Sequence, residues 1–328
     1  TFTSTDGSMF SIADGATINA AGDFAIFGTG SATSAFSFFS LDTNTSFGVA
    51  PNVTVGSGAP ASVSINGTLI GGTNFTFTTQ NNSPFLRLHG NVSLNQTGAS
   101  ALVSLTGTST INAAGSFLSM FASSPAPSMT LGGSLLSATG ATITTTGTAL
   151  GVFNGSALAY NTADQTKPFV KLDASSLTTG TGFGGDFLNV SGFGGAAGTT
   201  VSTATFNGPL LLATNGSSVS LQRDVIIGSS GATIIGNTTD PFVQVNGSTL
   251  TLAAGGEVAG LFNGTDMTLN GPLLSVASTL VAPGGIADIS NGSRLLVVSD
   301  TTPVVVITGG SHTIASDTAP FPAAMFNL

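Results

Sequence analysis

The sequence predicts an all-β protein, a single-chain parallel β-helix (β-solenoid), from three observations. A short phrase returns along most of the 328 residues: a few apolar residues, a polar turn, and a second alternating apolar stretch. Strong helix formers other than Ala and Leu are scarce, because the chain has 45 Gly, 13 Pro and only five Lys plus Arg. Recurrence of one short unit is typical of repeat proteins, whose units stack on one another.

The phrase returns about every 17 residues. Examples are the stretches that begin at Phe85, Phe169 and Phe242. From Phe85 to Val304 the phrase advances in 13 steps, so the mean step is about 17 residues (304 − 85, divided by 13). Helical repeats need about 33 residues and leucine-rich repeats more than about 20. We therefore predict one coil of the solenoid per about 17 residues, with about 18 coils.

Strands and turns can be recognised within the phrase. Apolar and polar residues alternate in 217–221 and 248–252, as half-buried strands require. Asn-Gly, Gly-Thr and Gly-Ser pairs, which tolerate φ > 0, separate the strands. Coils ~4.8 Å apart would build a rod on the order of 85 Å long. Since the hexapeptide pattern of left-handed helices is missing, we expect a right-handed one.

An ordinary β-sandwich is the structural alternative, because strands every 8–12 residues would suit it. The phrase, however, recurs in the same order along the chain, and no hairpin-type alternation is evident. We expect one β-solenoid domain over 1–328, with a core rich in the 23 Phe. Irregular insertions are expected near 47–61, 73–83, 123–128 and 178–200, with a non-repeat tail over 315–328.

Composition limits the partners and the compartment. Hydrophobic residues make up 41% of the chain and charged residues only 6%, with a net charge of −9. Five cations cannot build the basic patch that nucleic acids or anionic membranes require. No apolar run approaches the ~20 residues of a membrane span, so no membrane insertion is expected. Cysteine is absent, and the chain opens on Thr1 without a Met, as expected of a mature product or an excised segment.

No catalytic constellation is recognisable, and we expect the protein not to be an enzyme. His89 and His312 are many repeats apart, and Glu257 is the only Glu. The thirteen Asp are spread singly, often beside turns, and the nearest candidate pairs, Asp164 with Asp173 and Asp288 with Asp300, are not spaced by one repeat. The stretch 182–187 contains one loose copy of a calcium-binding Gly-Gly-x-Gly-x-Asp motif, which favours a Gly-rich loop over an ion site. We expect no cofactor and no metal.

Asn-x-Ser/Thr sequons are frequent. Two explanations apply: Asn-Gly provides left-handed turn geometry before a strand, or the asparagines carry glycans. Composition alone favours the turn explanation, and stacked Asn and Thr are expected to bond along the rod. The candidate glycosylation sites are Asn44, Asn52, Asn66, Asn74, Asn81, Asn91, Asn95, Asn154, Asn189, Asn215, Asn237, Asn246, Asn263 and Asn291.

One stretch has a near duplicate. Residues 107–115 read Gly-Thr-Ser-Thr-Ile-Asn-Ala-Ala-Gly, and residues 15–22 read Gly-Ala-Thr-Ile-Asn-Ala-Ala-Gly. With the low charge, the absence of Cys and the Gly/Ser/Thr/Asn richness, these loose coils resemble the β-helical shafts of bacterial surface proteins, namely filamentous-haemagglutinin-like exoproteins and autotransporter passengers. The resemblance implies an extracellular, cell-surface rod with a structural or adhesive role. The family's N-terminal secretion domain is not recognisable.

The two ends of the repeat region are apolar and show no cap-like segment. We therefore expect a secreted structural subunit of an extracellular filament or sheath that assembles with itself, head to tail, through uncapped solenoid ends. The alternative is an adhesin shaft or surface module that binds glycans or a host surface, and a polysaccharide lyase or hydrolase is a remote third reading. The candidate assembly residues are Phe2, Met9, Phe10, Phe321, Met325, Phe326 and Leu328.

Overall fold

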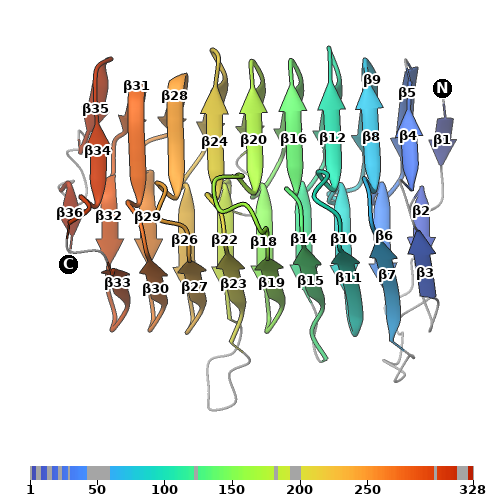
Figure 1. Cartoon of the computed structure of the whole chain (residues 1–328), viewed down its shortest axis with the longest axis horizontal. Helices are drawn as coiled ribbons and strands as arrows, with labels where there is room; N and C mark the ends of the chain where they lie inside the picture. Colours follow the sequence, from blue (N-terminus) through green and yellow to red (C-terminus); the bar gives the residue numbers. More distant parts are fainter. Residues whose placement is uncertain are drawn as a thin grey trace.

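The protein is a parallel β-helix. In the computed structural model the regular elements of the described residues are all strands, which pair in parallel and stand side by side along one long axis (Figure 1). The first strand, β1 (Phe2–Ser4), and the last, β36 (Phe326–Asn327), lie at opposite ends of this rod (Figure 1). The structure describes residues 2–4, 9–12, 17–20, 24–28, 30–42, 60–121, 125–180, 184–192, 201–298, 301–315 and 324–327.

Within the described residues, sheet A has 17 strands in two columns, A1 and A2, joined by β28 (Val243–Leu252) and β31 (Leu274–Ala282), which run through both. The other strands of A1 are β4 (Ala25–Phe27), β8 (Ile70–Thr73), β12 (Val103–Thr106), β16 (Leu136–Thr139), β20 (Val170–Asp173), β24 (Leu211–Thr214) and β34 (Val305–Ile307). The other strands of A2 are β1, β5 (Gly30–Ser34), β9 (Phe75–Thr79), β13 (Thr110–Ala113), β17 (Thr142–Thr145), β21 (Ser176–Thr179), β25 (Ser218–Leu221) and β35 (His312–Ile314).

Sheets B and C form the remaining sides of the coil. The ten strands of sheet B that the structure describes are β2 (Phe10–Ile12), β6 (Phe39–Asp42), β10 (Leu86–His89), β14 (Leu118–Phe121), β18 (Leu150–Phe153), β22 (Leu188–Ser191), β26 (Ile226–Ser229), β29 (Glu257–Leu261), β32 (Gly285–Ile289) and β36. In the same part of the chain, the nine strands of sheet C are β3 (Thr17–Ala20), β7 (Ala61–Ile65), β11 (Val92–Gln96), β15 (Ser128–Leu131), β19 (Ala157–Tyr160), β23 (Thr203–Phe206), β27 (Thr233–Gly236), β30 (Asp266–Leu269) and β33 (Arg294–Val297).

One coil is about twice as long as the sequence repeat, so the predicted coil length is wrong. Leu86 pairs with Leu118, and Leu118 pairs with Leu150, so each step of pairing spans two phrases of the sequence. Along sheet B, nine steps of pairing lead from Phe10 to Phe326, a mean of about 35 residues per coil (326 − 10, divided by 9). Ten stacked strands ~4.8 Å apart make a rod on the order of 45 Å long, about half the predicted length.

The sequence repeat is a half-coil. The phrase beginning at Phe85 enters β10 of sheet B, and the next one, at Leu102, enters β12 of sheet A. Each half consists of an apolar corner residue, a short strand, a polar turn and a second strand. Because both halves must cover the same core from opposite sides, they require the same pattern of apolar residues. This similarity explains why the phrase recurs twice per coil.

The core fills the inside of the coil. Strand residues alternate between buried and partly exposed, and the apolar residue just before many strands is buried as well. Phe38, Phe85 and Phe117 stack along the axis with ring centroids 5.4 and 5.5 Å apart. Further along, Phe206 contacts Phe169 and Phe242 edge to face. These rings bury large apolar surfaces without a polar atom to satisfy.

A row of buried serines closes the corner between columns A1 and A2. The backbone N–H of Ser175 donates to Oγ of Ser217 at 3.0 Å, and the N–H of Ser217 donates to Oγ of Ser248 at 3.1 Å. The N–H of Ser248 donates in turn to Oγ of Ser278 at 3.0 Å. Ser175 and Ser217 lie between strands, and the pairing of β28 with β31 shifts register at this corner, so the hydroxyls satisfy N–H groups that would otherwise lack a partner.

The predicted insertions coincide only partly with irregular segments. The range 73–83 contains β9, which pairs with β5 and β13 as a regular strand of its coil. The range 178–200 contains β22, which is regular too. Residues 47–59, 122–124, 181–183, 193–200, 316–323 and 328 lie outside the described residues. None of the described segments is a helix of the length and apolarity needed to cross a membrane.

Candidate functional site

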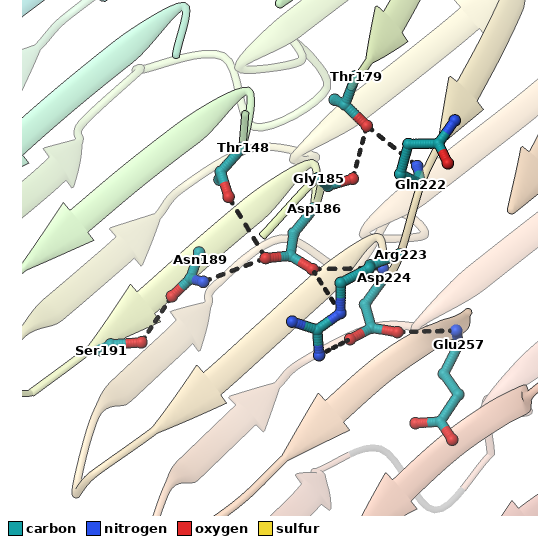
Figure 2. A network of polar contacts seen from close by, with 10 residues as sticks. All are labelled: Thr148, Thr179, Gly185, Asp186, Asn189, Ser191, Gln222, Arg223, Asp224 and Glu257. Carbon is teal, nitrogen blue, oxygen red and sulfur yellow. Dashed lines mark hydrogen bonds and ion pairs between the residues drawn. The ribbon is translucent and has the colours of Figure 1, made fainter. Parts of the chain in front are cut away.

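Three acidic residues form a row along the rod. Asp186 precedes β22, Asp224 precedes β26, and Glu257 begins β29. The pairing of Leu188 with Ile226, and of Ile226 with Ala259, places the three acidic residues at equivalent positions of successive coils. We call Asp186, Asp224 and Glu257 the carboxylate row (Figure 2).

The first member of the row is fully enclosed. Asp186 is 0% exposed, and its Oδ2 accepts hydrogen bonds from Thr148 Oγ1 at 3.3 Å and from Asn189 Nδ2 at 3.1 Å. Its Oδ1 accepts a bond of 3.4 Å from the backbone N–H of Asp224. The neighbouring Gly184 has φ +98°, and a Cβ there would lie 2.4 Å from Thr148 Oγ1. The loop therefore needs Gly at this position to bring the backbone close to the carboxylate.

Backbone and guanidinium groups connect the row. The N–H of Glu257 donates to Oδ1 of Asp224 at 2.9 Å. Arg223 lies across the first two members, with Nε 3.9 Å from Asp186 Oδ1 and Nη2 3.8 Å from Asp224 Oδ2. Figure 2 shows the arginine on one side of both carboxylates. Its side chain is 53% exposed, so these long ion pairs are open to solvent on one side.

Burial raises the pKa of all three acidic groups. Desolvation raises the pKa of Asp186, against the opposing effects of Arg223 and Asn189. Desolvation is also the largest cause at Asp224, whose pKa is raised to about 7, and at Glu257, whose pKa is raised to about 8 with a contribution from the charge of Asp224. Since Asp186 and Asp224 are buried, they are closed to a substrate, and their direct effect is on the stability of the coil.

The row corrects one inference from the sequence. The aspartates were predicted to be spread singly, often beside turns, with no basis for choosing a pair. Asp186 and Asp224 are one coil apart, because each lies two positions before one member of the pair Leu188 and Ile226. The predicted coil, half as long, placed them more than two coils apart. Among the described residues, no group of three or more His, Cys, Asp or Glu is placed to hold a metal ion.

A long groove follows the outer face of sheet B. It has a volume of about 1120 Å³ and takes lining residues from successive coils, beginning beside β6 and ending at Arg223, just before β26. Outward-facing residues of β10, β14 and β22 contribute to its floor, among them Arg87, Ser119 and Asn189. We call it the sheet B groove.

The lining combines aromatic faces with hydroxyl and amide groups. The guanidinium carbon of Arg87 lies 5.5 Å from the ring centroid of Phe121, in a cation–π contact. The ring of Phe153 lies against the backbone of Gly151, since a Cβ there would be 2.3 Å from Cε2 of that ring. Both rings line the groove and are partly exposed. Among its described lining residues there are two arginines and no Asp or Glu.

The histidines do not form part of a shared site. His89 packs against Phe121 with ring centroids 4.6 Å apart, in β10. His312 belongs to β35 in the last coil, where its Nε2 contacts the backbone oxygen of Gly309. These two residues lie many coils apart, as expected from the sequence.

Several sequon asparagines adopt the predicted turn geometry. Asn154, Asn215, Asn263 and Asn291 have φ between 54° and 57°, and each is followed by a Gly with φ > 0. Asn74 and Asn81 also have positive φ, whereas Asn66 and Asn246 do not. Exposed sequon asparagines are Asn66, Asn74, Asn81, Asn95, Asn215, Asn246, Asn263 and Asn291, those partly exposed are Asn91, Asn154, Asn189 and Asn237, and Asn44 and Asn52 lie outside the described residues.

Side-chain contacts between coils confirm the expected stacking of polar residues. Asn237 Nδ2 donates to Asn207 Oδ1 at 2.8 Å, and Thr73 and Thr106 share a bond of 2.9 Å between their hydroxyls. Asn291 Nδ2 donates to Asn263 Oδ1 at 3.3 Å. Glycosylation itself stays a prediction.

The two ends of the rod carry the candidate assembly residues. Met9 and Phe10 are partly buried at the first coil, and Phe2 lies in β1. Met325 and Phe326 are 48% and 42% exposed at the last coil. Phe321 and Leu328 lie outside the described residues.

Comparisons with models of known protein families, with curated proteins and with solved structures found no match.

Proposed function

We propose that this protein is a structural subunit of an extracellular filament or sheath, built by head-to-tail stacking of solenoid ends. One observation carries the proposal: among the described residues, the last core layer has apolar side chains that no further coil covers. Val305 and Ile307 of β34 are partly exposed, although their pairing partners Leu274 and Val276 in the preceding coil are 0% exposed. Phe326 is 42% exposed opposite Ala287, which is buried.

The other end has the same character. Phe10 of β2 is partly exposed, whereas Phe39, its partner in the next coil, is fully buried. Within the described residues, β1, β2, β3 and β4 pair on one side only, and so do β33, β34, β35 and β36 at the opposite end. Open strand edges are templates for pairing with another chain.

A second copy can stack on either end because the same sheets continue from coil to coil. Strands of sheets A, B and C run parallel at every level, so the last coil of one copy can continue in the first coil of the next. The surfaces in contact would differ on the two partners. Such heterologous contacts form a closed ring only if successive copies rotate back onto the first copy. Otherwise they produce an open filament.

The location outside the cell and the absence of catalysis belong to the same proposal. The scarcity of charge and the resemblance in style to bacterial surface shafts support an extracellular or cell-surface rod. The burial of Asp186 and Asp224 supports a structural role, because a carboxylate closed to solvent cannot act on a polysaccharide.

The test places a charge in the uncovered layer. Ile307→Lys is expected to convert fibres of the purified full chain into single rods, since stacking would bury an unpaired ammonium group. Thr178→Lys is the matched control, because Thr178 is exposed on the outer face of β21 in the middle of the rod. Sedimentation velocity measures the assembly, and a thermal melt checks that both variants fold. Equal assembly of the two variants would contradict the proposal.

A further inference from the structure

We propose that the sheet B groove binds an acidic polysaccharide laid along the axis of the rod. This inference is independent of filament formation, because the groove lies on the side of the rod and not at its ends. Its support comes from the shape of the groove, the charge of its lining and the chemistry of its surface.

The shape favours a chain-like ligand. The groove crosses sheet B from the coil of β6 to Arg223, which precedes β26. These two strands are five steps apart in the sheet order, and at ~4.8 Å per step the distance is on the order of 24 Å. A single sugar or a small anion would occupy only part of this length, whereas an extended polymer can contact every coil.

The charge of the lining selects an anion. The chain has a net charge of −9 and only five Lys plus Arg, yet two of these, Arg87 and Arg223, line the groove together with no Asp or Glu among its described lining residues. They belong to coils four strand steps apart, roughly 19 Å along the axis. Local positive charge on an acidic protein attracts an anionic chain and places it.

Both arginines are held in position for this role. Arg87 lies over the ring of Phe121. Arg223 is 53% exposed, and its nitrogens are 3.8–3.9 Å from Asp224 and Asp186, longer than a direct hydrogen bond. These long ion pairs leave the exposed side of the guanidinium open to solvent. The outer N–H groups of Arg223 can therefore bind a ligand carboxylate.

The surface between the arginines matches a sugar polymer better than an acidic polypeptide. It presents hydroxyl and amide groups, among them those of Ser119, Asn154 and Asn189, with the faces of Phe121 and Phe153. Sugar hydroxyls both donate and accept hydrogen bonds, as these side chains do. The C–H faces of sugar rings can pack on the ring of Phe153. An acidic polypeptide has few hydroxyls to offer.

The experiment measures binding of the full chain to defined polymers by isothermal titration calorimetry. The probes are polygalacturonate, its monomer galacturonate, neutral dextran and poly-L-glutamate. We expect polygalacturonate to bind more tightly than the other three, with affinity that falls as salt is raised. Arg87→Gln and Arg223→Gln are each expected to raise Kd about tenfold, the cost of one charge-assisted hydrogen bond. Lys171→Gln, on β20 of sheet A, removes the same charge away from the groove and should leave Kd unchanged.

A second pair of variants makes the test independent of any loss of folding in the arginine variants. Ser119→Glu places a carboxylate on the floor of the groove and should abolish binding, whereas Ser104→Glu on β12 of sheet A should not. Polygalacturonate binding no tighter than dextran or poly-L-glutamate would overturn the proposal. So would arginine variants that bind as well as Lys171→Gln.

Discussion

Asp224 lies in the coil next to Asp186, and its backbone N–H donates a hydrogen bond of 3.4 Å to the Oδ1 atom of Asp186. Both carboxyls are buried, and Glu257 continues the row in the following coil. A row of acidic groups through consecutive coils makes the stability of the rod depend on pH. Figure 2 shows how few cationic groups accompany the row: Arg223 alone, among the residues drawn.

The protein is expected to be more stable at pH 5 than at pH 8. Burial raises the pKa of Asp224 from 3.8 to about 7 and that of Glu257 from 4.5 to about 8. Below about pH 4 both groups are protonated in the folded and unfolded chain. As pH rises, the unfolded chain loses these protons first, so folding stability is lost through the window from about pH 4 to pH 8. The loss for Asp224 is on the order of 2–4 kcal/mol.

Chemical denaturation at several pH values measures this effect. Asp224→Asn should raise the free energy of unfolding at pH 8 relative to the wild type and flatten its pH dependence. Asp266→Asn is the control, because Asp266 is exposed and paired with Arg294 at 3.1 Å. A wild-type protein whose stability rises from pH 5 to pH 8 would contradict the role assigned to the row.

Ser217→Ala is expected to destabilise the fold by about 1–3 kcal/mol. The substitution removes the Oγ acceptor of the Ser175 N–H, which is buried at the corner of columns A1 and A2. Ser218→Ala, one residue later on the exposed side, should change the free energy of unfolding by less than about 0.5 kcal/mol. Equal effects of the two substitutions in urea denaturation would show that the serine row contributes nothing at this corner.

Asn263→Ala is expected to cost about 1–2 kcal/mol, whereas Asn263→Gly should be close to neutral. Asn263 has a φ of 56°, which a residue with a Cβ adopts only at a cost unless its side chain compensates. Thermal melting of both variants checks the turn explanation of the Asn-Gly sequons. If the Gly variant loses as much stability as the Ala variant, the asparagine side chain and not the backbone geometry is decisive.

Phe206→Ala is expected to destabilise the rod by about 3–5 kcal/mol, because it leaves a cavity between Phe169 and Phe242. Phe153→Ala is the matched control, since Phe153 is only partly buried and lies on the outside of sheet B. Removing the Phe153 ring should lower the free energy of unfolding by clearly less than Phe206→Ala does. Guanidinium denaturation measures the free energy of unfolding of both variants. A larger loss for Phe153→Ala than for Phe206→Ala would contradict the assignment of the core.

The sequence predicted the architecture better than its dimensions. Alternation in 217–221 and in 248–252 identified β25 and part of β28, because one face of each strand is buried. The coil length could not be read from the phrase, since opposite sides of the coil need the same pattern. The near-identical strings around 17–20 and 110–113 illustrate this: one forms β3 in sheet C, the other β13 in sheet A.

The carboxylate row and the sheet B groove were missed because each depends on which coils stack on one another. With the correct coil length, the spacing of Asp186 and Asp224 by one coil would have predicted a row. The sheet B groove had no signal in the sequence, because Arg87 and Arg223 are far apart along the chain and only the stacking of coils brings them to one face. Right-handed winding stays a prediction.

Cryo-electron microscopy of the purified full chain tests the central claim, head-to-tail stacking, most directly. The predicted result is fibres with a ~4.8 Å repeat along their axis and an axial step per copy on the order of 45 Å, the length of ten stacked strands. Single rods at every salt concentration and pH, or fibres in which the rods lie across the axis, would contradict the claim.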